Sequence, residues 1–468
     1  MSLNVKEKNE WIFNNFDLIN AIRRCHTNDK KLLARTLKLS WPTLNNMIIK
    51  MFDYDSNPIS QNEKGVYRIN PQFGYFVGLS IGGLETQLSI LDFTLSPINN
   101  VQDNNETKKI KEALMSLKAY KAREDSDALV CFETPQYPQD LSTLCNKIIN
   151  IVLDVFEQSN HDLLGIGLTF PGILSSDKNN NDFKVVFCPN LSRLVGLSLI
   201  DLFDKRVLKK IYDNNISFVL SHDTDAATVF EKENLYKASN RSLYEHCNKS
   251  NYACIYLDVG LGMGLIINNT LLKGSCHSVG EIGHLIAPAL SFDNEDFSEK
   301  ESKTISNIQK NKSNYSCYCG VKNCLEHELR TKVFGCDSQK EFLEKTSNEK
   351  LTAFHKNYSV QYKIFKQYIS YLMNLLINIL NVDVIILSGR IFNKMTPLKY
   401  DVELIKMSSG LAPSTNACKV VFGSERTDVV ALGGATMAYH NLKTQSELGY
   451  NTDKKLNIVW PIIKHELK

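Results

Sequence analysis

Short apolar runs that end close to glycines recur along most of the chain, and this feature limits the possible folds more than any other. Each run has the length and the β-branched content of a buried strand. Segments with helical spacing of apolar residues separate several of them. This alternation predicts an α/β architecture with functional residues on the loops at strand ends. The expected strands are 75–79, 87–92, 163–170, 216–220, 253–257 and 382–387, and the clearest helices are 141–158 and 360–380.

Two polar segments interrupt this pattern. Residues 99–127 are rich in Asn and Lys and are expected to form an insertion, or a loosely ordered loop with a short helix. Residues 288–316 are rich in Ser, Lys and Asn and are expected to form an exposed excursion. A chain of 468 residues favours two to three domains.

The first seventy residues have a different spacing of apolar residues, which predicts three short helices followed by a β-wing. Ser40 is placed to cap the third helix, and Pro42 is tolerated in its first turn. The alternating stretch 65–70 suits the returning strand of a wing. The segment resembles a winged helix-turn-helix. The residues expected to face its core are Phe16, Leu18, Ile19, Ile22, Leu32, Leu33, Leu37, Trp41, Leu44, Met47, Ile48 and Met51.

The third helix leaves Thr43, Asn45, Asn46 and Lys50 on its other face. Asn can pair with adenine through two hydrogen bonds, and Lys contacts phosphate or guanine. Residues 1–70 carry 11 Lys and Arg against 7 Asp and Glu, whereas the remainder carries 43 against 44. The small positive excess therefore lies where a DNA contact would need it. A helical docking module with a solvated polar face remains the alternative.

Other function classes are disfavoured by composition. The longest apolar stretches are too short to span a bilayer, and the N-terminus has no apolar signal core, so a cytoplasmic protein without membrane contact is expected. Twelve cysteines in a chain of this length do not predict a disulfide scaffold. Most of them stand alone in apolar runs, as small core residues do.

One group of cysteines is clustered. Cys317, Cys319 and Cys324 follow a Gly-Glu-Ile-Gly-His turn that ends at His284. Three thiolates and one imidazole form a tetrahedral set that suits a closed, structural zinc, with no open position for a catalytic water. Three buried thiols and an unrelated histidine are the alternative interpretation.

These two motifs together resemble the signature of the ROK (repressor, ORF, kinase) family. The resemblance extends from about residue 75 to residue 440 through the glycine-rich strand ends. It implies the two-lobed, actin-like ATPase fold of sugar kinases, and many regulators of this family carry an N-terminal winged helix-turn-helix. The expected domains are therefore a DNA-binding domain at 1–70 and a sugar-binding ROK domain at 71–468.

The resemblance also implies a sugar site. Asp223 matches the kinase base, Glu281 and His284 match the sugar-binding turn, and Glu326 matches the Glu after the third zinc ligand. Zinc would hold His284 in one orientation. His222 stands where the family has Asn, and Gly172 ends a strand of the same site. His284 and Cys317 lie 33 positions apart, a wider spacing than the family's, which is interpreted as an insertion.

Both phosphate-binding turns depart from the kinase pattern. The first has the family form Asp-x-Gly-Gly-Thr, but Ser80 and Leu84 replace its Asp and Thr, and Glu85 follows. The second has the form Gly-Thr-Gly-x-Gly, but Asp258 and Val259 replace its first two residues. Phosphoryl transfer depends on positioning and charge stabilisation, so these losses predict a pseudokinase.

The sequence thus predicts a sugar-responsive transcriptional regulator, most simply a repressor, that binds operator DNA and a monosaccharide or amino sugar. The sugar is expected to bind between the lobes and to select one hinge state. The family resemblance implies a homodimer or homotetramer. An active ATP-dependent sugar kinase and a sugar-sensing scaffold that does not bind DNA remain as alternatives.

Overall fold

The structure, a computed structural model, divides into two compact units. Unit 1 contains residues 1–230 and 430–468, and unit 2 contains residues 231–429. Each unit is described by itself. The structure describes residues 4–25, 30–52, 57–63, 65–98, 105–123, 126–177, 182–237, 249–274, 278–292, 298–310, 317–347, 351 and 354–447.

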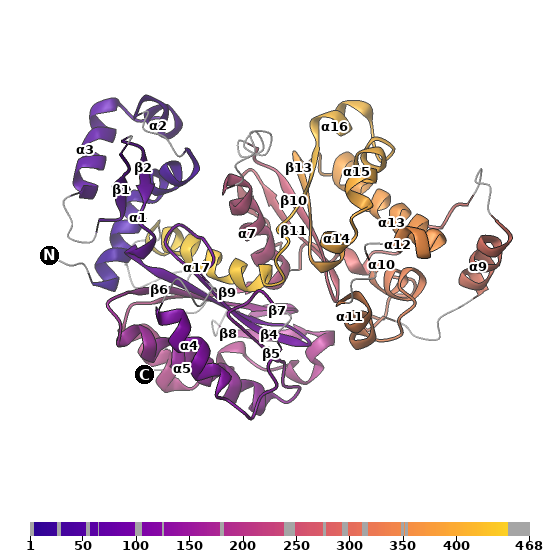
Figure 1. The fold of residues 1–468 in the computed structure, drawn as a ribbon, viewed down its shortest axis with the longest axis horizontal. Helices are drawn as coiled ribbons and strands as arrows, with labels where there is room; N and C mark the ends of the chain where they lie inside the picture. The colour runs from indigo at the N-terminus through magenta and orange to yellow at the C-terminus, as the bar shows by residue number, and fades with distance from the viewer. Residues whose placement is uncertain are drawn as a thin grey trace. The chain divides into compact units, whose positions relative to one another are not determined.

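A five-stranded sheet forms the centre of unit 1 (Figure 1), in the order β5-β4-β3-β6-β9. β3 pairs antiparallel with β4, which pairs antiparallel with β5, whereas β3, β6 and β9 run parallel. The strands end where the glycine-rich turns were expected. Their bounds are β3 Tyr75–Ile81, β4 Glu85–Leu91, β5 Val130–Glu133, β6 Leu163–Phe170 and β9 Ser217–His222.

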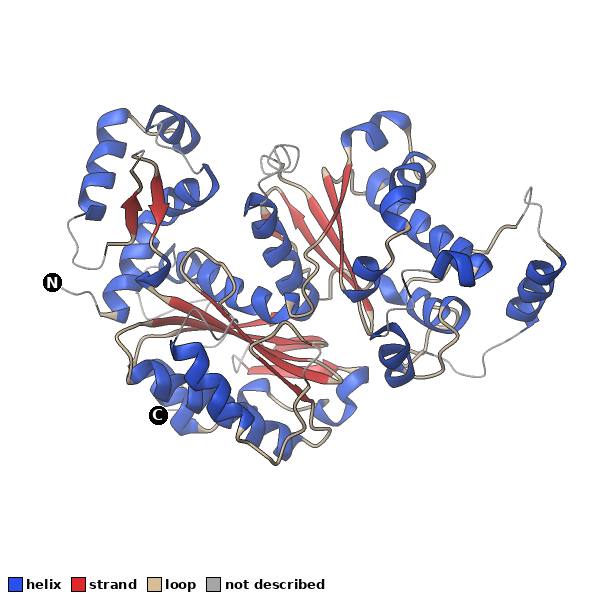
Figure 2. Cartoon of the chain, in the orientation of Figure 1, coloured by secondary structure: helices blue, strands red, loops and turns tan. Residues whose placement is uncertain are grey.

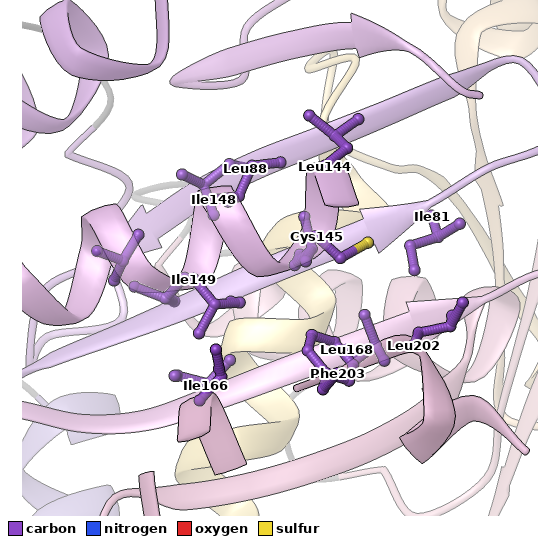
Figure 3. Packing of buried hydrophobic residues seen from close by; sticks show 14 of the residues in the cluster. Ile81, Leu88, Leu144, Cys145, Ile148, Ile149, Ile166, Leu168, Leu202 and Phe203 are labelled. Carbon is purple, nitrogen blue, oxygen red and sulfur yellow. The ribbon is translucent and has the colours of Figure 1, made fainter. Parts of the chain in front are cut away.

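Helices α4 (Asn105–Met115) and α5 (Pro138–Glu157) cover one face of this sheet. Figure 3 shows Cys145, Ile148 and Ile149 of α5 packed against strand residues such as Leu88 and Ile166. Ile110 and Leu114 of α4 are fully buried in the same core. The segment expected to form an insertion, or a loosely ordered loop with a short helix, thus contains such a helix, and α4 is packed because it presents an apolar stripe to α5.

The opposite face of the sheet is covered by α17 (Val429–Glu447) at very close range. A Cβ atom on Gly78 would lie 1.7 Å from the carbonyl oxygen of Ala431, and one on Gly167 would lie 1.9 Å from that of Gly434. Only glycine allows backbones to approach this closely. These strand glycines are therefore packing residues.

Unit 2 repeats the topology of unit 1. Its sheet has the order β12-β11-β10-β13-β14, with two antiparallel pairs followed by two parallel pairs. Helices cover both faces (Figure 2). The elements include α7 (Asp223–Lys237), which crosses from unit 1, β10 (Tyr252–Leu257), β11 (Leu261–Ile267), β12 (Thr270–Leu271), α9 (Glu299–Lys310), α10 (Leu325–Glu328), α11 (Gln339–Ser347), α12 (Phe354–Asn357), α13 (Ser359–Asn378), β13 (Val384–Ser388), α14 (Arg390–Lys394), α15 (Leu398–Met407), α16 (Ala412–Ala417) and β14 (Lys419–Phe422).

The expected exposed excursion contains one helix in its described part. α9 begins after Ser298, whose hydroxyl accepts from the N–H of Glu301 at 3.3 Å and caps the helix. Ile305 and Ile308 pack against the core of unit 2, while most of the other α9 side chains are exposed. The excursion is therefore anchored along one apolar edge.

Three helices and a hairpin form the N-terminal module. These are α1 (Val5–Cys25), α2 (Lys30–Leu37), α3 (Trp41–Phe52) and the antiparallel pair β1 (Ile59–Gln61) and β2 (Tyr67–Ile69). Ser40 caps α3, since its hydroxyl accepts from the N–H of Thr43 at 3.3 Å. The elements match the expected winged helix-turn-helix.

The core of this module differs most from the expectation at two positions, while Leu37 and Met47 are half-buried. Leu33, Leu44, Ile48 and Met51 are buried as expected, but Leu32 is 42% exposed and Trp41 is 53% exposed. Leu32 points to solvent because Leu33 and Ala34 form the buried face of the short helix α2. Trp41 is the first residue of α3, before the helix reaches the core formed by its later turns.

Helix α1 is longer than the apolar stripe predicted, and it packs against the rest of unit 1. The ring of Phe16 stacks on Tyr439 of α17 with centroids 4.9 Å apart. The guanidinium of Arg23 lies over the same tyrosine and donates to the carbonyl oxygen of Phe93 at 3.0 Å. The ammonium of Lys8 donates to the carbonyl oxygen of Phe73 at 2.8 Å. α1 thus belongs both to the module and to the core of unit 1.

None of the helices described is both long enough and apolar enough to cross a membrane.

Candidate functional site

The four expected metal ligands come together in unit 2. His284 ends a short 3-10 turn (Ile282–His284), and Cys317, Cys319 and Cys324 surround a tight turn in which Gly320 has a φ of +78°. One ligand atom from each residue lies within 4.8 Å of all the others. Ile286 pairs with Cys324 in an antiparallel bridge, which connects the histidine turn to the cysteine loop. The donor set and its spacing fit a tetrahedral zinc ion.

The titration behaviour of these groups reflects their crowding. The pKa of Cys317 is lowered, first by a hydrogen bond with Cys324 and also by one with His284, whose Nδ1 lies 3.7 Å from the sulfur. The same contact raises the pKa of His284. These hydrogen bonds favour the thiolate form of Cys317, and a thiolate is the form that binds metal.

Three of the expected sugar-binding residues lie beside this cluster in unit 2. The imidazole Nε2 of His284 is 3.8 Å from the carboxylate of Glu281. Burial raises the pKa of Glu326, while the N–H of Leu261 donates to its Oε2 at 2.9 Å and favours the charged form. Glu281 and His284 remain partly exposed. The group offers two carboxylates and an imidazole as partners for hydroxyl groups.

Glycines allow Glu326 to lie against the second glycine-rich turn. A Cβ on Gly260 would lie 3.1 Å from a carboxylate oxygen of Glu326, and a Cβ on Gly283 would lie 2.4 Å from the carbonyl oxygen of Leu261. Gly280 has a φ of +92° and approaches the backbone of Met263. Gly260 and Gly283 therefore make room for Glu326, and Gly280 allows the close approach to Met263, whether or not a phosphate binds.

The other expected residues of the sugar site lie in unit 1. Nδ1 of His222 is 3.3 Å from a carboxylate oxygen of Asp223 and 2.9 Å from the hydroxyl of Thr224. Gly172 lies against the backbone of Phe187 and the side chain of Cys188. His222 and Asp223 are both partly exposed at the end of β9 and the start of α7. They form a local pair that can donate to and accept from a ligand.

The first phosphate turn contains an ion pair that the sequence did not reveal. Ser80 is buried in β3, and the turn closes through a hydrogen bond from the N–H of Gly82 to the carbonyl oxygen of Glu85 at 2.8 Å. The carboxylate of Glu85 lies 3.3 Å from Nη1 of Arg123. An unpaired Glu85 would repel a phosphate at this turn, but Arg123 of the same unit compensates its charge.

The second phosphate turn contains a closer ion pair. Asp258 follows β10, and its Oδ1 lies 3.0 Å from Nε of Arg390, while Nη2 of Arg390 donates to Oδ2 at 3.3 Å. The hydroxyl of Tyr256 donates to the same oxygen at 3.4 Å. The side chains of Arg390 and Asp258 are only 7% and 14% exposed. Val259, next to them, adds no hydroxyl donor.

The predicted DNA-contacting residues do not all present free side chains. Thr43, Asn46 and Lys50 are exposed on α3. Asn45 is half-buried, and its side-chain oxygen accepts from the ammonium of Lys30 at 2.7 Å. Contact between Asn45 and a DNA base stays a prediction, and it would require the Asn45 side chain to give up its hydrogen bond with Lys30.

Sequence reasoning missed Arg123 and Arg390. Arg390 directly follows Ser388-Gly389 at the end of β13. Because β10 and β13 are parallel neighbours, their ends lie at the same edge of the sheet. The position of Arg390 near the glycine-rich turn after β10 could therefore have been predicted. Arg123 lies in the segment that was interpreted as an insertion, and no local pattern connected it with Glu85.

With this geometry established, the chain can be placed in a family. The sequence profile of the ROK family matches residues 108–441. This match covers well over half of the chain, which therefore belongs to the ROK family, as the sequence motifs predicted.

Two curated relatives and one solved structure illustrate the similarity. The chain is 28% identical to the xylose repressor of Bacillus subtilis (strain 168) over 148 residues, or 32% of this chain and 33% of the repressor. It is 26% identical to the xylose repressor of Staphylococcus xylosus over 162 residues, or 32% of this chain and 36% of the repressor. The chain thus matches only about a third of the length of these relatives.

The solved structure is described as a ROK family transcriptional regulator and homolog of the E. coli MLC protein. It covers 93% of this chain and 99% of its own, with a TM-score of 0.57 and 15% identity. This likeness concerns the fold alone. It confirms the expected mixed α/β fold of the family, and the N-terminal region is consistent with a helix-turn-helix.

Proposed function

We propose that this protein is a sugar-responsive DNA-binding repressor that does not transfer phosphate. The observation that carries the proposal is the ion pair between Asp258 and Arg390 in the second phosphate turn. A nucleotide phosphate at this turn would meet a carboxylate, and the nearest arginine is already engaged. Since phosphoryl transfer depends on stabilising negative charge, such a turn is poorly suited to it.

The DNA-binding part of the proposal is supported by the N-terminal module. Its third helix exposes Asn46 and Lys50 three and seven positions after Thr43, on a helix capped by Ser40. We propose that this helix enters the major groove and that Thr43, Asn45, Asn46 and Lys50 make the contacts. The proposed domain limits are 1–70 for this module and 71–468 for the sugar-binding domain.

The sugar-binding part is supported by the group formed by Glu281, His284 and Glu326. Carboxylates accept strong hydrogen bonds from hydroxyls, and an imidazole can donate or accept. We propose that zinc, bound by His284, Cys317, Cys319 and Cys324, fixes the orientation of the imidazole. Its part is structural, because all four ligand positions are filled by the protein.

The ligand is proposed to be a monosaccharide or an amino sugar, with Gly172, His222 and Asp223 contributing from unit 1. Two of the similar proteins are named xylose repressors, so xylose is the first sugar to test. For the sugar to act as an effector it must bind the DNA-binding form and the released form with different affinity. We further propose that the protein acts as a homodimer or homotetramer on successive half-sites in the cytoplasm.

Fluorescence anisotropy tests this proposal with labelled duplexes selected by the protein from fragmented genomic DNA. The full chain should bind with a steep dependence on salt. Asn46→Ala with Lys50→Ala should weaken binding at least tenfold and reduce the salt slope by about one. Lys109→Ala, an exposed lysine on α4, is the matched control and should leave both unchanged.

The sugar arm uses the same assay. Xylose, glucose and N-acetylglucosamine are added to the preformed complex, and Glu281→Gln should abolish any response while leaving DNA affinity intact. Indifference of the DNA complex to all sugars in a wide panel would refute the effector role. Release of ADP that depends on sugar and is lost in Asp223→Asn would instead support the kinase alternative. Sugar binding without DNA retention in low salt would support the scaffold.

A further inference from the structure

The third helix of the N-terminal module exposes two large apolar side chains that the set of DNA contacts proposed above leaves out. Trp41 is 53% exposed and Ile49 is 52% exposed. The core of the module takes Leu44, Ile48 and Met51 from other positions of α3. Trp41 and Ile49 therefore lie on a part of the helix that its own packing does not use.

Trp41 and Ile49 belong to one row of side chains along α3. Trp41, Asn45 and Ile49 are separated by four positions each, and residues four apart are neighbours on a helix. The row ends at Phe52, whose ring centroid lies 6.4 Å from that of Tyr67 in β2, so the wing partly covers it. What remains is an apolar side chain, an amide and a second apolar side chain. We call these three residues the α3 row.

The amide in the middle of the α3 row is oriented by α2. The side-chain oxygen of Asn45 accepts from the ammonium of Lys30 at 2.7 Å. Paired recognition of adenine uses the oxygen and the nitrogen of an asparagine amide at once. Because the oxygen is engaged with Lys30, the amide nitrogen is the group of Asn45 that remains for a base. The α3 row therefore offers a hydrogen-bond donor between two apolar groups.

Among the four bases, thymine has the edge that matches this order of groups. In the major groove thymine presents a methyl group beside the acceptor O4. Cytosine presents an amino donor, which would meet the donor of Asn45, and it has no methyl group. Guanine presents acceptors without a methyl group, and adenine needs an acceptor as well as a donor. A row that combines apolar contact with donation therefore favours thymine.

The charges around the α3 row favour nucleic acid as the partner. Residues 30–52 contain five Lys and Arg and no Asp or Glu. Lys31, Arg35, Lys38 and Lys50 are exposed, which suits contact with DNA phosphates. Two apolar side chains are too few for a protein interface, which buries about 800 Å² per partner, or for insertion into a membrane surface. Contact with the methyl group of a base needs only one.

The start of α3 is held in place before DNA binds. Trp41 is the first residue of the helix, and the hydroxyl of Ser40 accepts from the N–H of Thr43 at 3.3 Å. In helix-turn-helix proteins the N-terminal residues of the second helix contact base edges. Ile49, two turns later, has a β-branched side chain with few rotamers. Both apolar groups are thus presented from a fixed backbone, which lowers the entropy cost of the contact.

We propose that Trp41 and Ile49 recognise thymine in the operator by contact with its methyl group, while the amide nitrogen of Asn45 donates to O4. This inference rests on the proposed binding of DNA by α3, and it adds the base that the helix selects. Burial of one methyl group contributes about fourfold in affinity, so two contacts contribute more than ~10-fold.

A duplex in which deoxyuridine replaces every thymine tests the proposal, because uracil keeps O4 and lacks only the methyl group. Fluorescence anisotropy compares this duplex with the parent duplex, which the full chain selects from fragmented genomic DNA. The wild-type protein should bind the uracil duplex at least ~10-fold more weakly. Replacing thymines one at a time should confine the loss to the few positions that face Trp41 or Ile49.

Variants assign the loss to the two side chains. Trp41→Ala and Ile49→Ala should each bind the thymine duplex about fourfold more weakly and lose the same factor of discrimination, and the double variant should bind both duplexes equally. Trp41→Phe, which keeps an apolar ring, should retain most of the discrimination. Met115→Ala, which truncates an exposed side chain of α4, is the matched control and should behave like the wild type. Circular dichroism verifies that each variant is folded.

The outcomes separate this inference from the DNA-binding proposal. Equal binding of the thymine and uracil duplexes by the wild type would leave DNA binding intact and overturn thymine recognition. A loss of affinity in Trp41→Ala and Ile49→Ala that is the same for both duplexes would overturn it too, because the side chains would then act on something other than the methyl group. A chain that binds neither duplex refutes DNA binding, and thymine recognition with it.

Discussion

Neutralising Asp258 should create an anion site at the second phosphate turn. In the wild-type protein a phosphate can approach Arg390 only by displacing the Asp258 carboxylate from a contact of 3.0 Å. Two unit charges at this distance attract by roughly 5 kcal/mol at an effective dielectric constant of 20. Much of this attraction is offset by the loss of hydration on forming a largely buried pair, so we take ~2 kcal/mol as the net term that opposes phosphate.

Asp258→Asn keeps the shape and the contact with Tyr256 but removes the charge. Since 1.4 kcal/mol corresponds to a factor of ten, the variant should bind ADP at least ~30-fold more tightly than the wild type. Isothermal titration calorimetry of the full chain measures the two affinities. A thermal shift at fixed ADP concentration gives an independent measure through ligand-linked stabilisation.

The control removes the cation as well. Asp258→Asn combined with Arg390→Ala should not gain affinity, because no positive group then faces the turn. Wild-type protein that binds ADP as tightly as Asp258→Asn would refute the reasoning. An equal gain in the double variant would show that the arginine does not supply the attraction.

Three further predictions concern zinc, packing and pH. The purified chain should contain one zinc per molecule by atomic absorption, Cys319→Ser should lose it, and a chelator should lower Tm by ~5 °C or more. Gly167→Ala should destabilise unit 1 by at least ~3 kcal/mol in urea unfolding, because its Cβ would lie 1.9 Å from a backbone oxygen of α17. Gly196→Ala has no neighbour within 4 Å and should cost only the ~1–2 kcal/mol of backbone strain at its φ of +92°. Burial raises the pKa of Glu231 to about 7 from 4.5. The folded state then holds a proton that the unfolded state has released, so stability should fall by about 3 kcal/mol as pH rises from 4.5 to 7, and Glu231→Gln should abolish this slope in urea titrations.

The strands and the cluster of three cysteines and a histidine were predictable because their signals are local. The run 163–170 forms β6 at the predicted limits, and the other strands differ by a residue or two, since each is a compact apolar segment bounded by turn residues. The meeting of His284 with Cys317, Cys319 and Cys324 was predictable despite the wide spacing between His284 and Cys317, because residue type and close cysteine spacing carry the information.

Contacts between distant residues were not predictable in the same way. The packing of α1 involves Tyr439, more than 400 positions later, which contacts Phe16 and Arg23. The bond between Lys30 and Asn45 joins two helices whose relative placement the helical period does not give. Apolar spacing predicts which residues can share a face, but the neighbouring elements decide whether that face is covered, as the exposed Trp41 shows.

Each phosphate turn has an acidic side chain in it or directly after it, and in each case that side chain is paired with an arginine. A turn that binds nucleotide must leave donors unsatisfied until the ligand arrives, because those donors are what the phosphate uses. Here Glu85 pairs with Arg123 in unit 1, and Asp258 pairs independently with Arg390 in unit 2. Each turn has thus acquired an internal anion together with an internal cation. Turns with this pairing are poorly suited to bind a nucleotide, which is the reason for the proposal that the protein responds to a sugar without requiring one.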